Sequence, residues 1–206
     1  MRWRIVNSTN IMISVTKEAF DLVKSNLKII ALELSEVFDK VDEEKVDKVV
    51  GYINNAPRIF VAGAGRSGLM MKAFSMRLMH IGFDVHVIGD VTTPNSRSGD
   101  LLILGTGSGE TESLRSYANK AKKLGLNVIT LTSFVDSTLG NLADITMQIP
   151  APTPKSDKTS DITSIQPMGA LFEQSLLICL DGLIMELMAE KKKDANNMFQ
   201  NHANLE

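Results

Sequence analysis

The sequence predicts an α/β fold, a three-layer αβα sandwich around a five-stranded parallel sheet, with additional helices at the N-terminus. The prediction depends on five short apolar runs of strand length, each bounded by Gly, Ser, Thr or Pro. The runs are RIFVAG (58–63), DVHVIG (84–89), DLLILG (100–105), NVITLT (127–132) and DITMQI (144–149). Helical stretches separate these runs, and strands that alternate with helices form right-handed crossovers and a parallel sheet.

The composition is typical of one globular domain. The 206 residues are enough for a well-buried core, and the chain is 44% hydrophobic and 22% charged. The net charge is −2 and basic residues form no stripe, so nucleic acid is not an expected partner. The stretch MRWRIVNSTNIMISV resembles neither a signal peptide nor a membrane span, and the single cysteine, Cys179, fits a reducing compartment. We therefore expect a cytoplasmic protein with no membrane partner.

Two helices are predicted before the first strand. Thr16–Val41 repeats apolar residues at helical spacing, which indicates a long amphipathic helix. Asp42 is a suitable N-cap for a second helix, which the residues 54–57 (NNAP) end. We therefore divide the chain into an N-terminal helical segment, 1–45, that packs on the domain, and the domain itself, 46–206.

The C-terminal part contains an unusual loop and an unusual helix. Pro150–Pro167 holds four of the six prolines and is too long for an ordinary connection, so both a mobile lid and a passive excursion stay open. From Met168 to about Lys191 the chain is apolar on nearly every side of a helix, and we expect burial on nearly every side. A lone domain does not easily enclose such a helix, which indicates a subunit interface.

The first strand runs into a Gly-rich loop. Gly63, Gly65 and Gly68 form the pattern G-x-G-x-x-G between a strand and a helix, the context in which helix N–H groups bind a phosphate. A dinucleotide site also needs an acidic residue at the end of the second strand. Asp84 begins that strand and Asp90 lies past its end, which weakens the dinucleotide interpretation and leaves it open.

The third strand runs into a second Gly-rich loop, GTGSGETES. Thr106, Ser108 and Thr111 supply hydroxyls that can converge on one anion. Ser108 alone could be a helix N-cap, but a cap does not account for the other hydroxyls and the glycines. Both loops flank the crevice at the carboxyl ends of the strands, which favours a single phosphomonoester over an extended dinucleotide. Glu110 and Glu112 would repel a phosphate if they faced it, so they must point away or have another role.

The two loops together resemble the SIS (sugar isomerase) domain, a flavodoxin-like fold. Four further motifs resemble the 6-phospho-3-hexuloisomerase family: MRLMHIGF (76–83), TTP (92–94), PMGALFE (167–173) and HANLE (202–206). The resemblance covers the chain from about Val46 to the end. Thr106 stands where the family pattern has Ser, and the hydroxyl is kept.

The resemblance implies an isomerase that interconverts D-arabino-hex-3-ulose 6-phosphate and D-fructose 6-phosphate, by moving a carbonyl between C3 and C2 through an enediol. It implies the ribulose monophosphate pathway, a sugar phosphate as the partner, no cofactor, and a homotetramer built as a dimer of dimers. The expected phosphate-binding residues are Gly65, Arg66, Ser67, Thr106, Ser108, Gly109 and Thr111.

Three residues are candidates for proton transfer. Glu173 lies near the start of the apolar final helix, where a carboxylate is costly unless it is paired or functional. An ion pair and a general base are both compatible with its position, and the resemblance favours the base. Periodicity alone favours a core or interface role for His80, whereas the resemblance implies proton handling across a subunit boundary. His202 lies in a polar tail, and the resemblance implies that this tail docks beside a site. The histidines and the cysteine lack metal-ligand spacing, so no metal site is predicted.

Two other function classes stay open. A non-catalytic module that senses phosphosugars would need the phosphate loops but neither Glu173 nor His80. A nucleotide-dependent oxidoreductase would use the first Gly-rich loop for a dinucleotide. The fold by itself does not choose among these classes.

Overall fold

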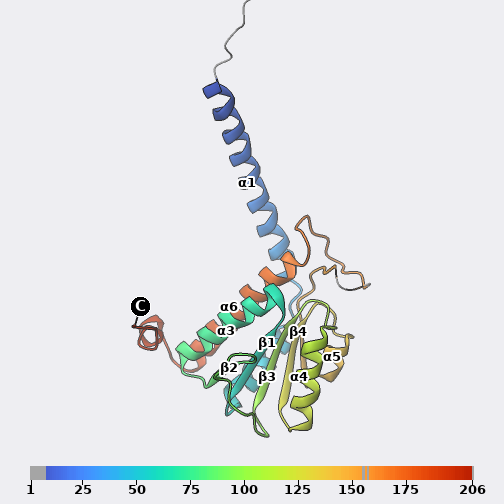
Figure 1. Cartoon of the computed structure of the whole chain (residues 1–206), viewed down its shortest axis with the longest axis vertical. Coiled ribbons are helices and arrows are strands. Elements are labelled where there is room, and N and C mark those ends of the chain that lie inside the picture. The colour runs from blue at the N-terminus through green and yellow to red at the C-terminus, as the bar shows by residue number, and fades with distance from the viewer. Residues whose placement is uncertain (1–7, 155, 157, 206) are drawn as a thin grey trace, which may run out of the picture.

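The computed structural model describes residues 8–154, 156 and 158–205, with side chains from residue 22 onward. Figure 1 shows α1 projecting from a body in which helices flank a sheet. The elements in chain order are α1 (Ser8–Phe38), α2 (Glu43–Asn55), β1 (Ile59–Gly63), α3 (Gly65–Ile81), β2 (Val85–Val87), β3 (Leu101–Thr106), α4 (Glu112–Lys123), β4 (Asn127–Thr132), α5 (Thr138–Leu142), β5 (Ile145–Gln148), α6 (Ala170–Glu190) and α7 (Ala195–Phe199). Within these residues, no helix combines the length and the apolar character that crossing a bilayer requires.

The sheet confirms the predicted topology. Its order is β2-β1-β3-β4-β5 and every neighbouring pair is parallel, so each predicted apolar run forms one strand. The strand order reverses at β1 and β3, because β2 lies on one side of β1 and the later strands lie on the other. The carboxyl ends of β1 and β3 are therefore the expected position of a ligand crevice. Gly63 at the end of β1 is in register with Gly105 near the end of β3. The two Gly-rich loops therefore leave the sheet side by side.

The two faces of the sheet are covered by different helices. Ile59 and Val61 of β1 belong to the core under α2, α3 and α6, whereas Phe60 and Ala62 belong to the core under α4 and α5. This alternation follows the two-residue period of a strand. All four side chains are buried, as expected for a parallel sheet with helices on both faces. The three-layer αβα sandwich is thus the observed fold.

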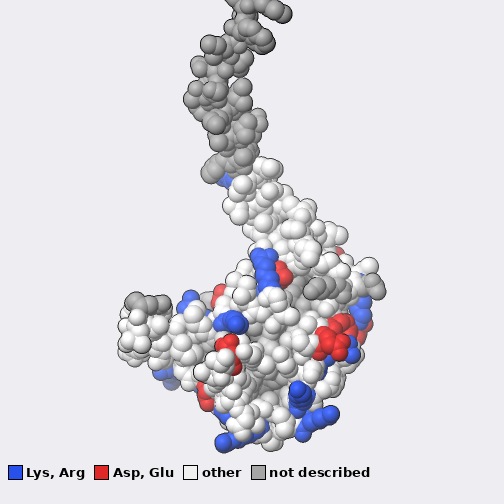
Figure 2. All heavy atoms as spheres, viewed as in Figure 1, with Lys and Arg blue, Asp and Glu red and all other residues white. Residues whose placement is uncertain are grey.

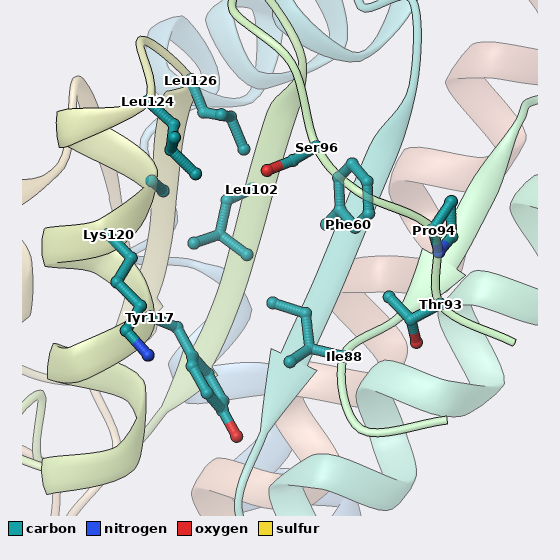
Figure 3. Close-up of a pocket in the computed structure, with 11 residues that line it drawn as sticks. Phe60, Ile88, Thr93, Pro94, Ser96, Leu102, Tyr117, Lys120, Leu124 and Leu126 are labelled. Atoms are coloured by element: carbon teal, nitrogen blue, oxygen red, sulfur yellow. The ribbon is translucent and has the colours of Figure 1, made fainter. Parts of the chain in front are cut away.

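The connection from β2 to β3, residues 88–100, contains no helix, and an apolar hollow lies beneath it on the α4 face of the sheet (Figure 3). The hollow has a volume of about 200 Å³. Phe60, Leu102 and Tyr117 are among its lining side chains, and Lys120 is the one cation of the lining. The described lining is mainly apolar and includes no residue of the two Gly-rich loops.

The N-terminal helix is longer than predicted, and among its residues with described side chains the buried ones lie toward its C-terminal end. It begins at Ser8 rather than Thr16 and ends at Phe38. Near this end Val37 is fully buried, and α1 contacts α6. Further up, four large apolar side chains are 56–71% exposed: Leu22, Val23, Leu27 and Leu32. The division of the chain at residue 45 stays a prediction.

The start of α2 is as predicted. The Asp42 carboxylate accepts hydrogen bonds from the backbone N–H groups of Glu44 at 2.9 Å and Lys45 at 3.4 Å. The final helix differs from the expectation of burial on nearly every side. Ile178 is 43% exposed and Met185 is 72% exposed, because α1, α2 and α3 pack on other sides of α6 and leave these side chains uncovered in the single chain.

Candidate active site

A cavity of about 150 Å³ lies at the carboxyl ends of β1 and β3, where the crevice was expected. It is bounded by the first turns of α3 and α6, by the loop after β3, and by part of the Pro-rich segment. The lining residues are Ala64–Ser67, Gly105–Ser108, Thr111, Thr153, Pro154, Met168, Gly169, Phe172 and Glu173. The cavity therefore brings together both Gly-rich loops and the candidate base.

Three helices begin at this cavity without a side-chain cap. Within the described chain, the N-caps of α3, α4 and α6 make no side-chain hydrogen bond to their helices; these N-caps are Ala64, Thr111 and Gly169. By contrast, carboxylate or hydroxyl side chains cap α2, α5 and α7; they belong to Asp42, Ser137 and Asp194. Helix N-termini carry unsatisfied N–H donors and a partial positive charge. Three such termini facing one cavity make it a site for an anion.

The glycines of the first loop let α3 approach β1 closely. A Cβ on Gly63 would lie 2.9 Å from Gly68 Cα, and a Cβ on Gly68 would lie 2.7 Å from the Gly63 carbonyl oxygen. Neither separation is sterically possible for a larger residue, so glycine is required at both positions. Gly65, Arg66 and Ser67 form the start of α3 and all line the cavity, and the first N–H groups of a helix have no acceptor within the helix.

The hydroxyls of the second loop are held by local hydrogen bonds. Thr106 Oγ1 lies 3.3 Å from Thr111 Oγ1 and accepts the Gly109 N–H at 3.2 Å. Ser67, Thr106 and Ser108 are all buried. A hydroxyl can accept one hydrogen bond and still donate another. These side chains are therefore poised to donate to an anion in the cavity.

Ser108 does not cap α4, contrary to the capping alternative. Its Oγ accepts the Glu110 N–H at 3.2 Å and closes a turn before the helix, whose N-cap is Thr111. Glu110 points away from the cavity, as predicted, because its carboxylate accepts the N–H and the hydroxyl of Thr138 at 2.8 and 2.6 Å. These hydrogen bonds hold the pKa of Glu110 below its ordinary value.

Gly109 makes the sharp turn of this loop. Its φ is +69°, and a Cβ would lie 1.9 Å from Ser137 Oγ, so only glycine fits. Gly109 is outside the cavity lining, and its N–H is bonded to Thr106. Gly109 was expected to bind phosphate, but in the structure it is a turn residue whose N–H holds the Thr106 hydroxyl.

Arg66 and Glu173 form an ion pair across the cavity. Arg66 Nη1 donates to Glu173 Oε2 at 2.9 Å. The Arg66 side chain is 50% exposed and that of Glu173 is 20% exposed, so the arginine can turn while the carboxylate stays in the cavity wall. They are the charged members of the lining. The ion pair that was one of the two interpretations of Glu173 is thus present in the structure. The Glu173 carboxylate also lines the cavity in which a ligand would lie.

The Pro-rich segment supplies part of the cavity wall, which sequence reasoning did not assign. Thr153 and Pro154 line the cavity, and further along the segment Lys158 Nζ lies 2.7 Å from Asp136 Oδ1. The segment is therefore built into the site rather than being a passive excursion. The sequence signal for this was its length and proline content, which marked it as a functional loop.

His80 and His202 lie together, but at the other end of α3. Their ring centroids are 5.4 Å apart, and the His202 ring also stacks on Phe199 at 5.8 Å. Ser67 and His80 are 13 positions apart on one helix, a rise of about 20 Å. Figure 1 shows α7 beyond the end of α3 that lies away from α1. Neither histidine is among the described residues that line the cavity of its own chain.

His80 is 4% exposed. Burial lowers its pKa, and the nearby charges of Arg77 and His202 lower this pKa further. The Asn201 side chain donates to the His80 carbonyl oxygen at 3.0 Å, so the C-terminal tail is docked on α3. The tail is therefore docked within one chain, but at the end of α3 away from the cavity of that chain, and docking beside a site stays a prediction.

The comparisons with known proteins agree with this geometry. The SIS domain family matches residues 52–178, which include both Gly-rich loops, His80 and Glu173. The chain is 47% identical to the 3-hexulose-6-phosphate isomerase of Bacillus subtilis (strain 168) over 166 residues, 81% of this chain and 89% of that protein. It is 41% identical to the 3-hexulose-6-phosphate isomerase of Mycobacterium gastri over 186 residues, 90% of this chain and 92% of that protein.

A solved structure extends the similarity to three dimensions. The crystal structure of a hypothetical protein from Methanococcus jannaschii, described as inferring a molecular function of 3-hexulose-6-phosphate isomerase, superimposes with a TM-score of 0.77. The two chains are 34% identical, and the match covers 88% of this chain and 99% of that chain. Fold and sequence thus point to the same relatives.

Proposed function

This chain belongs to the SIS-domain family, where it is similar to 3-hexulose-6-phosphate isomerases over most of its length, and on that premise we propose that it interconverts D-arabino-hex-3-ulose 6-phosphate and D-fructose 6-phosphate. One observation carries the proposal. Three uncapped helix N-termini converge on a cavity that also contains a carboxylate, Glu173. Such a cavity can hold a phosphate and remove a proton from the sugar attached to it.

The phosphate is bound by the two Gly-rich loops. Backbone N–H groups at the start of α3 and the hydroxyls of Ser67, Thr106, Ser108 and Thr111 donate to its oxygens. Burial of Ser67, Thr106 and Ser108 supports the assignment, because a hydrogen bond to a charged group contributes more in a partly dry cavity. Arg66 adds a positive charge, and Gly65 and Gly109 shape the loops.

Glu173 is the general base. The reaction removes a proton from C2 of the 3-hexulose phosphate and returns a proton to C3, while the hydroxyl proton moves from O2 to O3 through the enediol. The carboxylate is held by Arg66 in the free protein. A bound phosphate dianion gives the arginine a more highly charged partner, which releases the carboxylate for proton transfer.

His80 and His202 act in the site of a neighbouring subunit. Because they lie a helix length from their own Glu173, a catalytic role requires a second chain that brings its histidine pair to this cavity. Exposed apolar side chains on three helices support association: Leu22, Leu27 and Leu32 on α1, Leu69 and Met76 on α3, and Ile178 and Met185 on α6. Figure 2 shows the described part of α1 as mostly uncharged on the face in view. We expect a homotetramer built as a dimer of dimers.

The proposed reaction also gives the protein a place in metabolism. It converts the hexulose phosphate of the ribulose monophosphate pathway into fructose 6-phosphate, and its phosphorylated substrate supports a cytoplasmic location because such anions do not cross membranes unaided.

The experiment that tests the proposed function is incubation of the purified protein with D-arabino-hex-3-ulose 6-phosphate, with fructose 6-phosphate measured over time. Formation of fructose 6-phosphate at a rate proportional to protein concentration is the expected result. Binding of the substrate without turnover would instead support a phosphosugar-sensing module. Nucleotide absorbance that persists through purification would support a dinucleotide enzyme.

A further inference from the structure

Glu33 is a buried carboxylate on α1 that is bonded to a single short turn of the Pro-rich segment. Glu33 is only 9% exposed. Three donors reach the carboxylate: Ser164 Oγ at 2.7 Å, the Ile165 backbone N–H at 2.9 Å and Gln166 Nε2 at 2.8 Å. Figure 1 shows this segment beside the base of α1. Residues more than 130 positions apart are therefore joined at one point.

The bonds hold Glu33 in its charged form. Burial by itself would raise the pKa of this carboxyl, but the hydrogen bonds from Gln166, Ile165 and Ser164 together hold the pKa below its ordinary value. Hydrogen bonds to an ionised group are stronger than those between neutral groups. A buried carboxylate with three such donors is a firm attachment between the helix and the turn.

The turn leads directly into the cavity wall. Met168 follows it with φ at +59°, in the left-handed region that side chains other than glycine rarely adopt. Such a residue keeps this conformation only where its surroundings impose it. Glu33 fixes the chain just before Met168, and α6 fixes the chain just after it. Both Met168 and Gly169, the N-cap of α6, line the cavity.

The position of Gly169 in turn sets the position of the proposed base. The Glu173 N–H donates to the Gly169 carbonyl oxygen at 3.0 Å, which forms the first turn of α6. A Cβ on Gly169 would lie 3.9 Å from Glu173 Oε1, so the carboxylate lies directly over this residue. A shift of the chain at Met168 would therefore move the carboxylate relative to the phosphate loops, which belong to other elements.

We propose that Glu33 is a positioning residue for the isomerisation: by holding the turn 164–166 it places the first turn of α6, and with it Glu173, at the correct distance from the bound phosphate. The inference rests on the proposed function. It also makes the base of α1 part of the active-site architecture, although α1 is outside the SIS match at 52–178.

The test compares three variants. Glu33→Ala removes the acceptor and leaves three donors unpaired. Glu33→Gln keeps an acceptor for the Ile165 N–H, and the Gln166 amide can turn over so that its oxygen accepts from the new amide. Glu36→Gln is the matched control, because Glu36 is an exposed carboxylate on the same helix and lies 3.7 Å from Lys40.

We expect the Ala variant to lose about tenfold to a hundredfold in kcat, the size of effect that follows a displaced catalytic group. Inhibition by inorganic phosphate should change much less than kcat, because the two Gly-rich loops that hold most of the proposed phosphate donors are not attached to the turn. The Gln variant should keep most of the wild-type kcat, and the Glu36→Gln control should keep all of it. If Glu33 only stabilised the fold, Glu33→Ala would lower the melting temperature but would not lower kcat more than it weakens phosphate inhibition.

Several results would overturn the inference. Wild-type kcat in folded Glu33→Ala protein would do so, as would an equal loss in the Gln variant, since the hydrogen bonds would then not be the cause. If Glu33→Ala does not fold, Gln166→Ala replaces it: this change removes one donor from the turn and leaves α1 intact. A loss of kcat in the same direction supports the inference, and an unchanged kcat contradicts it.

Amide hydrogen exchange separates this inference from the proposed function, because it needs no substrate. Faster exchange at 165–173 in Glu33→Ala than in the wild type and Glu36→Gln is the expected result. Unchanged exchange contradicts the tether whatever the activity. Absence of isomerase activity in the wild type would refute the proposed function and the positioning role with it.

Discussion

Arg66 Nη1 lies 2.9 Å from Glu173 Oε2, and this contact joins the first turn of α3 to the first turn of α6 across the cavity. The pair combines the charge that a phosphate needs with the proton acceptor that an enediol reaction needs. In the proposed mechanism the two groups take different places after substrate binds: the guanidinium on the phosphate and the carboxylate at the reacting carbons. Under that proposal, separation of the pair by substrate links binding to catalysis.

Replacing Glu173 by Gln should remove catalysis and keep binding. The amide has the shape of the carboxylate but does not accept a proton, so we expect turnover to fall by roughly 10²–10⁴. Calorimetry with inorganic phosphate should show an affinity at least as high as that of the wild type, because the amide no longer competes for Arg66 as an anion. The matched control is Glu186→Gln, an exposed carboxylate on the same helix, which should leave turnover unchanged. Near-normal turnover in the folded Glu173→Gln protein would remove this residue from the mechanism.

Replacing Ser108 by Ala should weaken phosphate binding. A hydrogen bond to a charged group contributes about 1.5–3 kcal/mol, so affinity for fructose 6-phosphate should fall by about tenfold to a hundredfold. Ser116→Ala, at an exposed position on α4, is the control. An unchanged dissociation constant for Ser108→Ala, measured by titration calorimetry, would count against the assigned phosphate site.

Local patterns in the sequence predicted much of this site. The apolar runs at strand length gave the parallel sheet, and the sheet by itself brings the ends of β1 and β3 together, with Gly63 in register with Gly105. The Asp42 cap and the outward direction of Glu110 were also predictable, because each depends on residues a few positions away or on the repulsion between like charges.

The contacts that join distant segments could not be predicted in the same way. Glu173 meets Arg66 over 107 positions, and Glu33 meets Gln166 over 133. Periodicity reports which face of an element is apolar, but not which loop lies over that face. The position of Thr153 in the cavity wall could not be predicted for the same reason. The stretch of α1 between Ser8 and Thr16 was missed because its Ser, Thr, Asn and β-branched residues have weak helical propensity.

Mixing inactive variants should restore activity if the site is shared. Glu173→Gln and His202→Ala subunits, each inactive alone, should regain partial activity in hybrids, because one interface then combines an intact carboxylate with an intact histidine pair. Hybrids of two Glu173→Gln preparations are the control and should stay inactive. Sedimentation as a monomer, or full activity after deletion of 201–206, would contradict a shared site.

His80 should make stability depend on pH in the mildly acidic range. Its pKa in the folded protein is below the ordinary value of 6.5, so the unfolded chain binds the proton more readily. The stability that comes from keeping His80 neutral is therefore fully present above pH 6.5. The free energy of unfolding should fall as the pH drops from 6.5 through the pKa of His80 in the folded protein. His80→Gln should flatten this part of the profile. Melting temperatures of both proteins at several pH values provide the measurement, and parallel profiles would show that His80 is not responsible.

The measurement that tests the central claim most directly is NMR of the reaction in D2O, starting from D-arabino-hex-3-ulose 6-phosphate. The account predicts fructose 6-phosphate with solvent deuterium at C3, because an enediol reprotonated by Glu173 exchanges its proton with the medium. The same sample with Glu173→Gln protein should show unreacted substrate. A wild-type protein that binds the substrate but forms no fructose 6-phosphate over many hours would contradict the account.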